Sequence, residues 1–173
     1  MEPFARFAAA LLVQQARFVV IGVAGANFYA RSGGTIFATQ DQDLFLPPEP
    51  ENLSRAWEAC SGLGMSLWAG DEPLDMPRDV RLARAVVQRS APTTATSDEL
   101  QVDLSLVMAG FDFDEVWAGR RTFVVDGVEI PVARLSDIVR SKAKAGREKD
   151  RLFLATHRDA LRQLMGKSYP AGD

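Results

Sequence analysis

The sequence is poor in the residues that build disulfides and zinc sites. Among its 173 residues it has one cysteine, Cys60, and one histidine, His157. An internal disulfide is therefore excluded, and so is a classical zinc site, which needs four Cys or His ligands. Cys60 falls within an expected helix, where a buried, inert thiol is the ordinary interpretation. His157 stands alone in the last expected helix and is interpreted as a packing or surface residue.

Long hydrophobic runs and strongly basic stretches are also missing. No segment reaches the roughly 18 apolar residues of a membrane span. The stretch MEPFARFAAALLVQQ starts with an acid and lacks a clear cleavage site, which favours a helix over a signal peptide. A formal net charge of −3 argues against broad, sequence-independent nucleic-acid binding but leaves a local basic groove open. We therefore expect a cytoplasmic protein that does not act at a membrane.

The composition is that of a globular protein with a sizeable core, because 47% of the residues are hydrophobic and 25% are charged. We expect one domain over residues 1–173, with a frayed tail at 166–173. The predicted order is helix, strand, helix, strand, helix, then several strands, then two helices, and it indicates an α+β fold in which helices flank a mixed central β-sheet.

Periodicity and turn residues predict the order of elements. Ser136 is the candidate N-cap of one helix and Gly146 its end, Gly33-Gly34 closes another, and Asp126-Gly127 is a strong hairpin turn. The predicted helices are 4–15, 23–34, 50–64, 112–119 (or a turn), 134–146 and 147–165. The predicted strands are 17–22, 35–46, 65–70, 80–90 (its first half also compatible with a helix), 100–107 and a hairpin at 120–132, with loops at 70–79 and 91–99.

Three aspartates stand where two predicted strands would place them on one polar face. Asp41 and Asp43 are two residues apart, and alternate residues of a strand point to the same side. Asp103 lies on the polar side of the alternating strand LQVDLSLV. If the two strands are neighbours, the carboxylates converge, and two such charges about 4.5 Å apart repel by roughly 3–4 kcal/mol at an effective dielectric of 20. A hard divalent cation such as magnesium, or manganese in its place, would supply the counter-charge and support phosphoryl or nucleotidyl transfer.

Two further segments could hold phosphate. VVIGVAG runs from a strand through Gly22 into a helix, whose N-terminal N–H groups attract anions. SKAKAGREKD contains Lys142, Lys144, Arg147 and Lys149, a basic cluster that could reach a triphosphate, and Arg147 can pair with Asp150 three residues later. Each feature also has a plain structural interpretation: a loop cap, a solvated strand face, a packed turn or a charged helix surface.

In this order the segments resemble the nucleotidyltransferase superfamily, the polymerase-beta-like fold, and in particular its small bacterial members, some of which are toxins of abortive-infection and toxin–antitoxin systems. The segments are VVIG, TQDQD, VDLSL and KAKAGREKD, within residues 17–46 and 100–155. The resemblance implies that Asp41, Asp43 and Asp103 bind metal and that Asp103 also helps to deprotonate the attacking hydroxyl. It further implies nucleotide binding by Gly22 with its helix, Thr39, Lys142 and Arg147.

The activity so implied is magnesium-dependent transfer of a nucleoside monophosphate from a nucleoside triphosphate to a hydroxyl of RNA, protein or a small molecule, with a toxin role as one option. Three positions depart from the family pattern: Val23 replaces a small residue, Gln42 an apolar one and Phe37 an arginine. They keep a second hypothesis open, a weakly active or inactive module that binds a nucleotide or a protein partner such as a cognate antitoxin. A third hypothesis is that the acids are structural or serve another metal phosphohydrolase.

Overall fold

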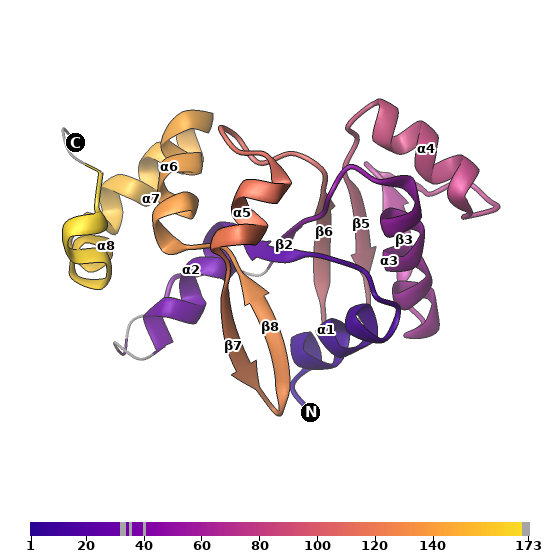
Figure 1. Cartoon of the computed structure of the whole chain (residues 1–173), viewed down its shortest axis with the longest axis horizontal. Helices are drawn as coiled ribbons and strands as arrows, with labels where there is room; N and C mark the ends of the chain where they lie inside the picture. Colours follow the sequence, from indigo (N-terminus) through magenta and orange to yellow (C-terminus); the bar gives the residue numbers. More distant parts are fainter. Residues whose placement is uncertain (32–33, 35, 40, 171–173) are drawn as a thin grey trace.

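The computed structural model describes residues 1–31, 34, 36–39 and 41–170 (Figure 1). Helices and strands alternate up to residue 62, strands predominate between residues 66 and 132, and helices follow from residue 135. The helices are α1 (Pro3–Val13), α2 (Gly22–Ala30), α3 (Pro50–Gly62), α4 (Val80–Gln88), α5 (Phe113–Gly119), α6 (Leu135–Ala145), α7 (Glu148–Thr156), α8 (Arg158–Met165) and the 3-10 helix η2 (Gly166–Ser168). The strands are β1 (Val19–Ile21), β2 (Asp41–Phe45), β3 (Ser66–Ala69), β4 (Glu72–Pro73), β5 (Thr93–Thr96), β6 (Gln101–Ser105), β7 (Arg121–Val125) and β8 (Val128–Val132).

Within the described ranges these strands form one mixed sheet in the order β4-β3-β5-β6-β2-β1-β8-β7. β1 with β8 and β2 with β6 are parallel, and the other neighbours are antiparallel. The predicted α+β class with a mixed central sheet is confirmed. None of the helices in these ranges is long and apolar enough to cross a membrane.

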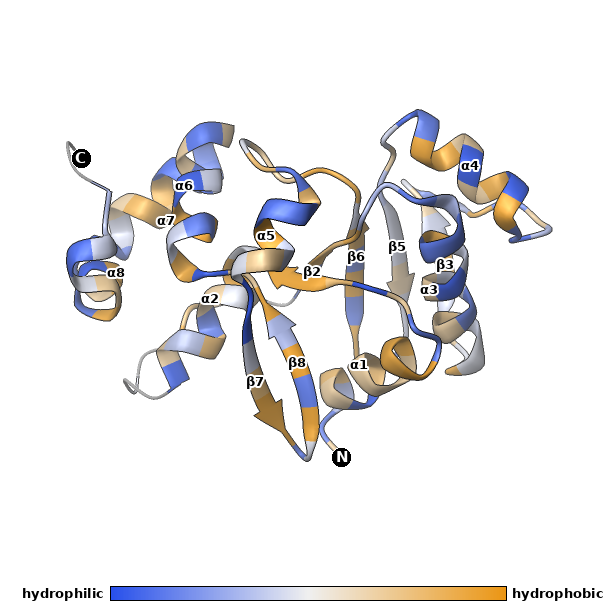
Figure 2. Cartoon of the chain, viewed as in Figure 1, coloured by the Kyte–Doolittle hydropathy of each residue, from blue (hydrophilic) through white to orange (hydrophobic). Residues whose placement is uncertain are grey.

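The hydrophobic core lies on both faces of the sheet. On one face, α1 and α3 pack against apolar side chains of β5 and β6, with Trp57 and Cys60 fully buried. On the other face, α5 and α6 cover β1 and the end of β2, while a third cluster joins α2 to α6 and α8. Figure 2 shows the orange apolar stretches of β2 and β8 inside this arrangement and polar stripes on the outer helices α3 and α4. Polar side chains lie on the part of the sheet that these helices leave uncovered.

Two predictions between residues 80 and 99 are wrong. The predicted strand 80–90 is the helix α4, whose first turn is capped by Asp79 accepting a hydrogen bond from Leu82 N–H at 3.0 Å. The predicted loop 91–99 contains β5, a central strand. Its threonines are β-branched residues that fit a half-buried strand, but their polarity resembles a turn.

Several boundaries also differ. β2 begins at Asp41 and not at residue 35, and residues 35 and 40 lie outside the described ranges, as does Gly33. The N-cap of α6 is Arg134 and not Ser136, whereas Gly146 does end α6 in the left-handed conformation at φ 61°.

The C-terminal segment differs as well. The predicted last helix divides into α7 and α8 at His157. The expected frayed tail begins with η2, and Tyr169 packs beneath Arg162, while 171–173 lie outside the described ranges.

Gly25 tests how closely α2 is held against the sheet. A Cβ at this position would lie 2.9 Å from Ile138 Cδ1 and 3.0 Å from the Val20 carbonyl oxygen. We expect Gly25→Ala to lower the free energy of unfolding by about 1–3 kcal/mol, because overpacking outweighs the gain in helix propensity. The matched control is Gly62→Ala at the end of α3, where a Cβ meets nothing within 4 Å. Urea unfolding measures both, and equal stabilities for the two variants would contradict the close packing of α2.

Candidate functional site

The acidic pair and the third aspartate lie on neighbouring strands, which is the condition for the predicted convergence of their carboxylates. β2 and β6 run parallel with Asp43 opposite Asp103 and Asp41 opposite Gln101. Alternate residues share a face, so the three aspartates occupy the same side of the sheet. The antiparallel neighbour β1 places Ile21 opposite Asp43, next to the start of α2.

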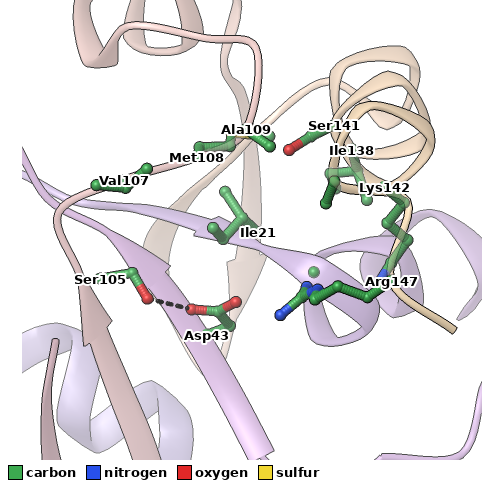
Figure 3. A pocket seen from close by; sticks show the side chains of 12 residues that line it. Ile21, Asp43, Ser105, Val107, Met108, Ala109, Ile138, Ser141, Lys142 and Arg147 are labelled. Atoms are coloured by element: carbon green, nitrogen blue, oxygen red, sulfur yellow. Dashed lines mark hydrogen bonds between the residues drawn. The ribbon is translucent and has the colours of Figure 1, made fainter. Parts of the chain in front are cut away.

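Hydroxyl groups hold two of these carboxylates in place. Ser105 Oγ donates a hydrogen bond to Asp43 Oδ1 and Thr94 Oγ1 donates one to Asp103 Oδ1, each at 3.0 Å (Figure 3 draws the first). Burial raises the pKa of Asp43 to about 6, with the Ser105 hydrogen bond opposing it and the charge of Asp103 adding to it. Burial also raises the pKa of Asp103, and the charge of Asp41 adds to that rise. The two carboxyls therefore ionise at the expense of stability.

The donor set suits a hard cation, because three carboxylates offer the oxygen ligands that magnesium and manganese accept. In the described part of the chain, however, no three His, Cys, Asp or Glu side chains are gathered closely enough to hold a metal ion. The Asp41 side chain is exposed, and Thr39 contacts the Asp41 backbone: Thr39 Oγ1 accepts from the Asp41 N–H at 3.3 Å and donates to the Asp41 carbonyl at 3.2 Å. Metal binding by the three aspartates thus stays a prediction.

Gly22 joins β1 to α2 directly beside Asp43. Its φ is +68°, a conformation that side chains other than glycine's rarely adopt, and an added Cβ would lie 3.4 Å from Asp43 Oδ2. No side chain of the described residues caps the first turn of α2. The N–H groups of this turn are therefore available to an anion placed next to the carboxylates.

Opposite the carboxylates, two cations are held by one buried acid. Asp150 is fully buried; it accepts hydrogen bonds from Arg147 Nε at 2.7 Å and Nη2 at 3.2 Å, and it pairs with Lys142 Nζ at 3.5 Å. Burial alone would raise the pKa of Asp150, but Arg147 and Lys142 hold it below the ordinary value. Burial lowers the pKa of Lys142, and Asp150 opposes that change. In Figure 3, Arg147 extends from the end of α6 towards Asp43.

Two cavities meet at Asp43, Gly22, Lys142 and Arg147. The first, here called the carboxylate cavity, has a volume of about 490 Å³. The second, the Ser105 cavity, measures about 340 Å³ and lies between the end of β6 and α6 (Figure 3). The carboxylate cavity is lined by every site residue that the sequence named, namely Gly22, Thr39, Asp41, Asp43, Asp103, Lys142 and Arg147, together with Lys149.

The three departures from the family pattern fall in different places. Phe37 is buried and does not line the cavity; its ring packs behind two lining residues, with its centroid 5.4 Å from that of Phe153 and 4.8 Å from that of His157. Gln42 alternates with the two aspartates and is half-buried. Val23 does line the carboxylate cavity at the start of α2. Only Val23 therefore stands where it could narrow a phosphate site.

Sequence reasoning missed three residues that organise the site. Ser105 and Thr94 fix the carboxylates, and Asp150 was assigned only a pairing with Arg147. The alternation of β6 could have indicated Ser105, because it shares the face of Asp103. Thr94 lies in the segment that the sequence wrongly predicts as a loop, so its place beside Asp103 could not be inferred. Nothing in the sequence pattern indicates that Asp150 is buried.

Comparisons with known proteins support the fold alone. No protein-family model matches the sequence, and no curated protein does. The structure is similar to a crystal structure titled as that of a "putative nucleotidyltransferase" from Thermotoga maritima, with a TM-score of 0.55, 14% identity and 91% of each chain covered.

The raised pKa of Asp43 predicts that this residue costs stability. A carboxyl whose pKa rises from 3.8 to about 6 on folding stabilises the protein below pH 4, and that contribution disappears as the pH rises through 6. We expect Asp43→Asn to be more stable than the wild type at pH 7, by about 3 kcal/mol at most, because one pKa unit corresponds to about 1.4 kcal/mol. Urea unfolding between pH 3.5 and 7.5 measures this. A gain that is independent of pH, or equal to that of the exposed control Asp71→Asn, would contradict it.

Asp150→Asn should have the opposite effect. It leaves Lys142, whose side chain is 13% exposed, without its counter-charge, so we expect a loss of about 3 kcal/mol in the free energy of unfolding at pH 7. Denaturant unfolding measures the loss, and Glu148→Gln, an exposed acid in the first turn of α7, is the control. If both variants lose equally little, the buried ion pairs do not stabilise the junction of α6 and α7.

Proposed function

We propose that this protein is a metal-dependent nucleotidyltransferase that moves a nucleoside monophosphate from a nucleoside triphosphate to an acceptor hydroxyl. One observation carries the proposal: Asp43 and Asp103 lie side by side on parallel strands, in a cavity that also contains the start of α2, Lys142 and Arg147. Acids and cations that face each other across a cavity suit a substrate that brings phosphates and metal together. The likeness in fold to the Thermotoga maritima protein supports the same class.

The residues divide the work between the two sides of the cavity. The N–H groups of α2, with Lys142 and Arg147, would bind the triphosphate. The acceptor oxygen would form a bond to the α-phosphorus, the bond from that phosphorus to the oxygen bridging to the β-phosphate would break, and pyrophosphate would leave. Asp103 would take the proton of the hydroxyl, and the raised pKa of its carboxyl favours that role.

Magnesium, or manganese in its place, would be held by Asp41, Asp43 and Asp103, and it would neutralise charge on the phosphates and polarise the reacting phosphorus. The chain's own part is to supply ionised carboxylates. Asp43 has a pKa of about 6 without metal, so protons compete with the cation below that pH.

A second candidate is a module of the same fold that binds a nucleotide or a protein partner without turnover. Val23 favours it, because a branched side chain lines the cavity at the turn where phosphate would approach. Calorimetric titration with nucleoside triphosphates and magnesium separates the two: binding without pyrophosphate release supports the module. A toxin role with a cognate antitoxin belongs to either candidate, and growth arrest on induction, relieved by a neighbouring gene, is its test.

The transfer itself is tested with each labelled nucleoside triphosphate, magnesium, and total cellular RNA and protein as acceptors. We expect label transfer that EDTA abolishes and that Asp41→Asn and Asp103→Asn reduce at least a hundredfold, because each removes a metal-binding carboxylate. Asp71→Asn, an exposed acid in the turn between β3 and β4, should transfer label at the wild-type rate. Unchanged transfer by Asp41→Asn would sink the proposed mechanism.

A further inference from the structure

A row of polar side chains leads away from the carboxylates across the sheet. The strand registers place Asp43 opposite Asp103, Asp103 opposite Thr94, and Thr94 opposite Trp68. Residues that are opposite in neighbouring strands point to the same face. Strands are spaced about 4.8 Å apart, so Trp68 lies roughly 10 Å from Asp103 along this row.

This part of the sheet is covered on one face only. Leu67, Ala95 and Val102 point into the core, where α1 and α3 lie. Trp68, Thr94 and Thr96 point the other way and remain half-buried, with Gln101 exposed beside them. Figure 1 shows β6, β5 and β3 following β2 in the sheet, on the side away from α6 and α7.

A shallow cavity of about 300 Å³, here called the Trp68 cavity, lies on this open face, lined by Trp68, Gly70, Thr94, Thr96 and Gln101. None of these lining side chains is charged. The indole is held in position because its Nε1–H donates a hydrogen bond to Thr96 Oγ1 at 2.9 Å. The cavity therefore offers a fixed aromatic surface bordered by neutral hydrogen-bonding groups.

The geometry of the proposed reaction places the Trp68 cavity on the acceptor side of the carboxylates. This step of the inference rests on the proposed function. In phosphoryl transfer the attacking and leaving oxygens lie roughly in line. The groups that would bind the leaving pyrophosphate lie beyond Asp43, at the start of α2 and on Lys142 and Arg147. The acceptor hydroxyl must then approach from the opposite side, over β6 and β5.

We propose that the Trp68 cavity binds the terminal nucleoside of a single-stranded nucleic acid, with its base stacked on Trp68 and its hydroxyl directed to Asp103. A base is a flat, neutral, polar group, which an aromatic face with hydroxyl and amide neighbours recognises. The uncharged lining does not suit a phosphate or a cationic acceptor. A separation of roughly 10 Å between Asp103 and Trp68 is of the size of one nucleoside.

The test is direct binding of a hexaribonucleotide with a free 3′ hydroxyl, without nucleoside triphosphate or magnesium. The sequence has three tryptophans; Trp57 is buried, and Trp117 is stacked on Phe113 and lies against Arg120, whose Cζ is 3.7 Å from its ring centroid. We expect the oligonucleotide to quench the fluorescence of the wild-type chain. Trp68→Phe should lose the quenching, and Trp117→Phe should keep it.

Calorimetry supplies the affinities. We expect Trp68→Ala to bind the oligonucleotide about tenfold more weakly, as removal of a base-stacking aromatic does. Trp68→Phe should bind within a few-fold of the wild type, because it keeps an aromatic face. Thr96→Val should weaken binding several-fold, because the indole loses its anchor; this variant and Trp68→Phe decide the matter if Trp68→Ala does not fold.

Equal affinity of wild type and Trp68→Ala, or quenching that survives Trp68→Phe, would overturn the proposal. Quenching by a serine-containing peptide or by a small-molecule polyol, without quenching by the oligonucleotide, would overturn it as well. Failure of the proposed function is a separate result: the wild-type chain would then show no magnesium-dependent label transfer from any nucleoside triphosphate, whatever the oligonucleotide does.

Discussion

The parallel pairing of β2 with β6 is the constraint on which the site depends. It sets Asp43 beside Asp103, and the same register sends the row onward to Thr94. A shift of β2 by one residue would turn Asp41 and Asp43 towards the core, where Leu44 and Leu104 now pack, and would separate Asp43 from Asp103. The apolar residues that alternate with the acids therefore fix the register, and the acids are carried to one face as a consequence. Hydroxyls of Ser105 and Thr94 then hold carboxylates that burial disfavours.

The cations on the side of the cavity opposite the carboxylates are held in place by a buried acid. Asp150 is a fully buried acid between two cations, an arrangement that is costly to create and costlier to break. It ties α7 to α6 through Lys142 and Arg147, and α6 also packs against α2 at Gly25. The three helices around the carboxylates are thus linked by one ion-pair group and one close contact. A cavity with acids on one wall and cations on the other results from these two constraints together.

Much of the site could be predicted from sequence, because the signals were local. Alternation in a strand placed Asp41 with Asp43, and strand–glycine–helix placed Gly22. The sequence could not predict that β2 and β6 are neighbours, because no local pattern shows which strands pair. The failures have the same origin. The sequence of α4 predicts a strand and that of β5 a loop, because β-branched residues in an amphipathic helix and threonines in a central strand reverse the usual preferences, and tertiary packing decides between them. Because β5 is not predicted, Thr94 is not recognised as a partner of Asp103, and the open face of the sheet beyond Asp103 is not recognised either.

Val23 is the residue that separates the two hypotheses, an active nucleotidyltransferase and a binding module without turnover. The structure shows how much of the cavity its side chain can affect. Phe37, another of the three departures, is a core residue whose ring packs on Phe153 and His157 behind the cavity lining, so its own ring does not occupy the cavity. Val23 packs against the same core cluster while also lining the cavity. Part of the Val23 side chain packs in this cluster, so only the remaining part can occupy the cavity. Its branched carbons can therefore coexist with N–H groups of α2 that face the carboxylates, because an anion at a helix N-terminus is bound through backbone groups and needs no particular side chain.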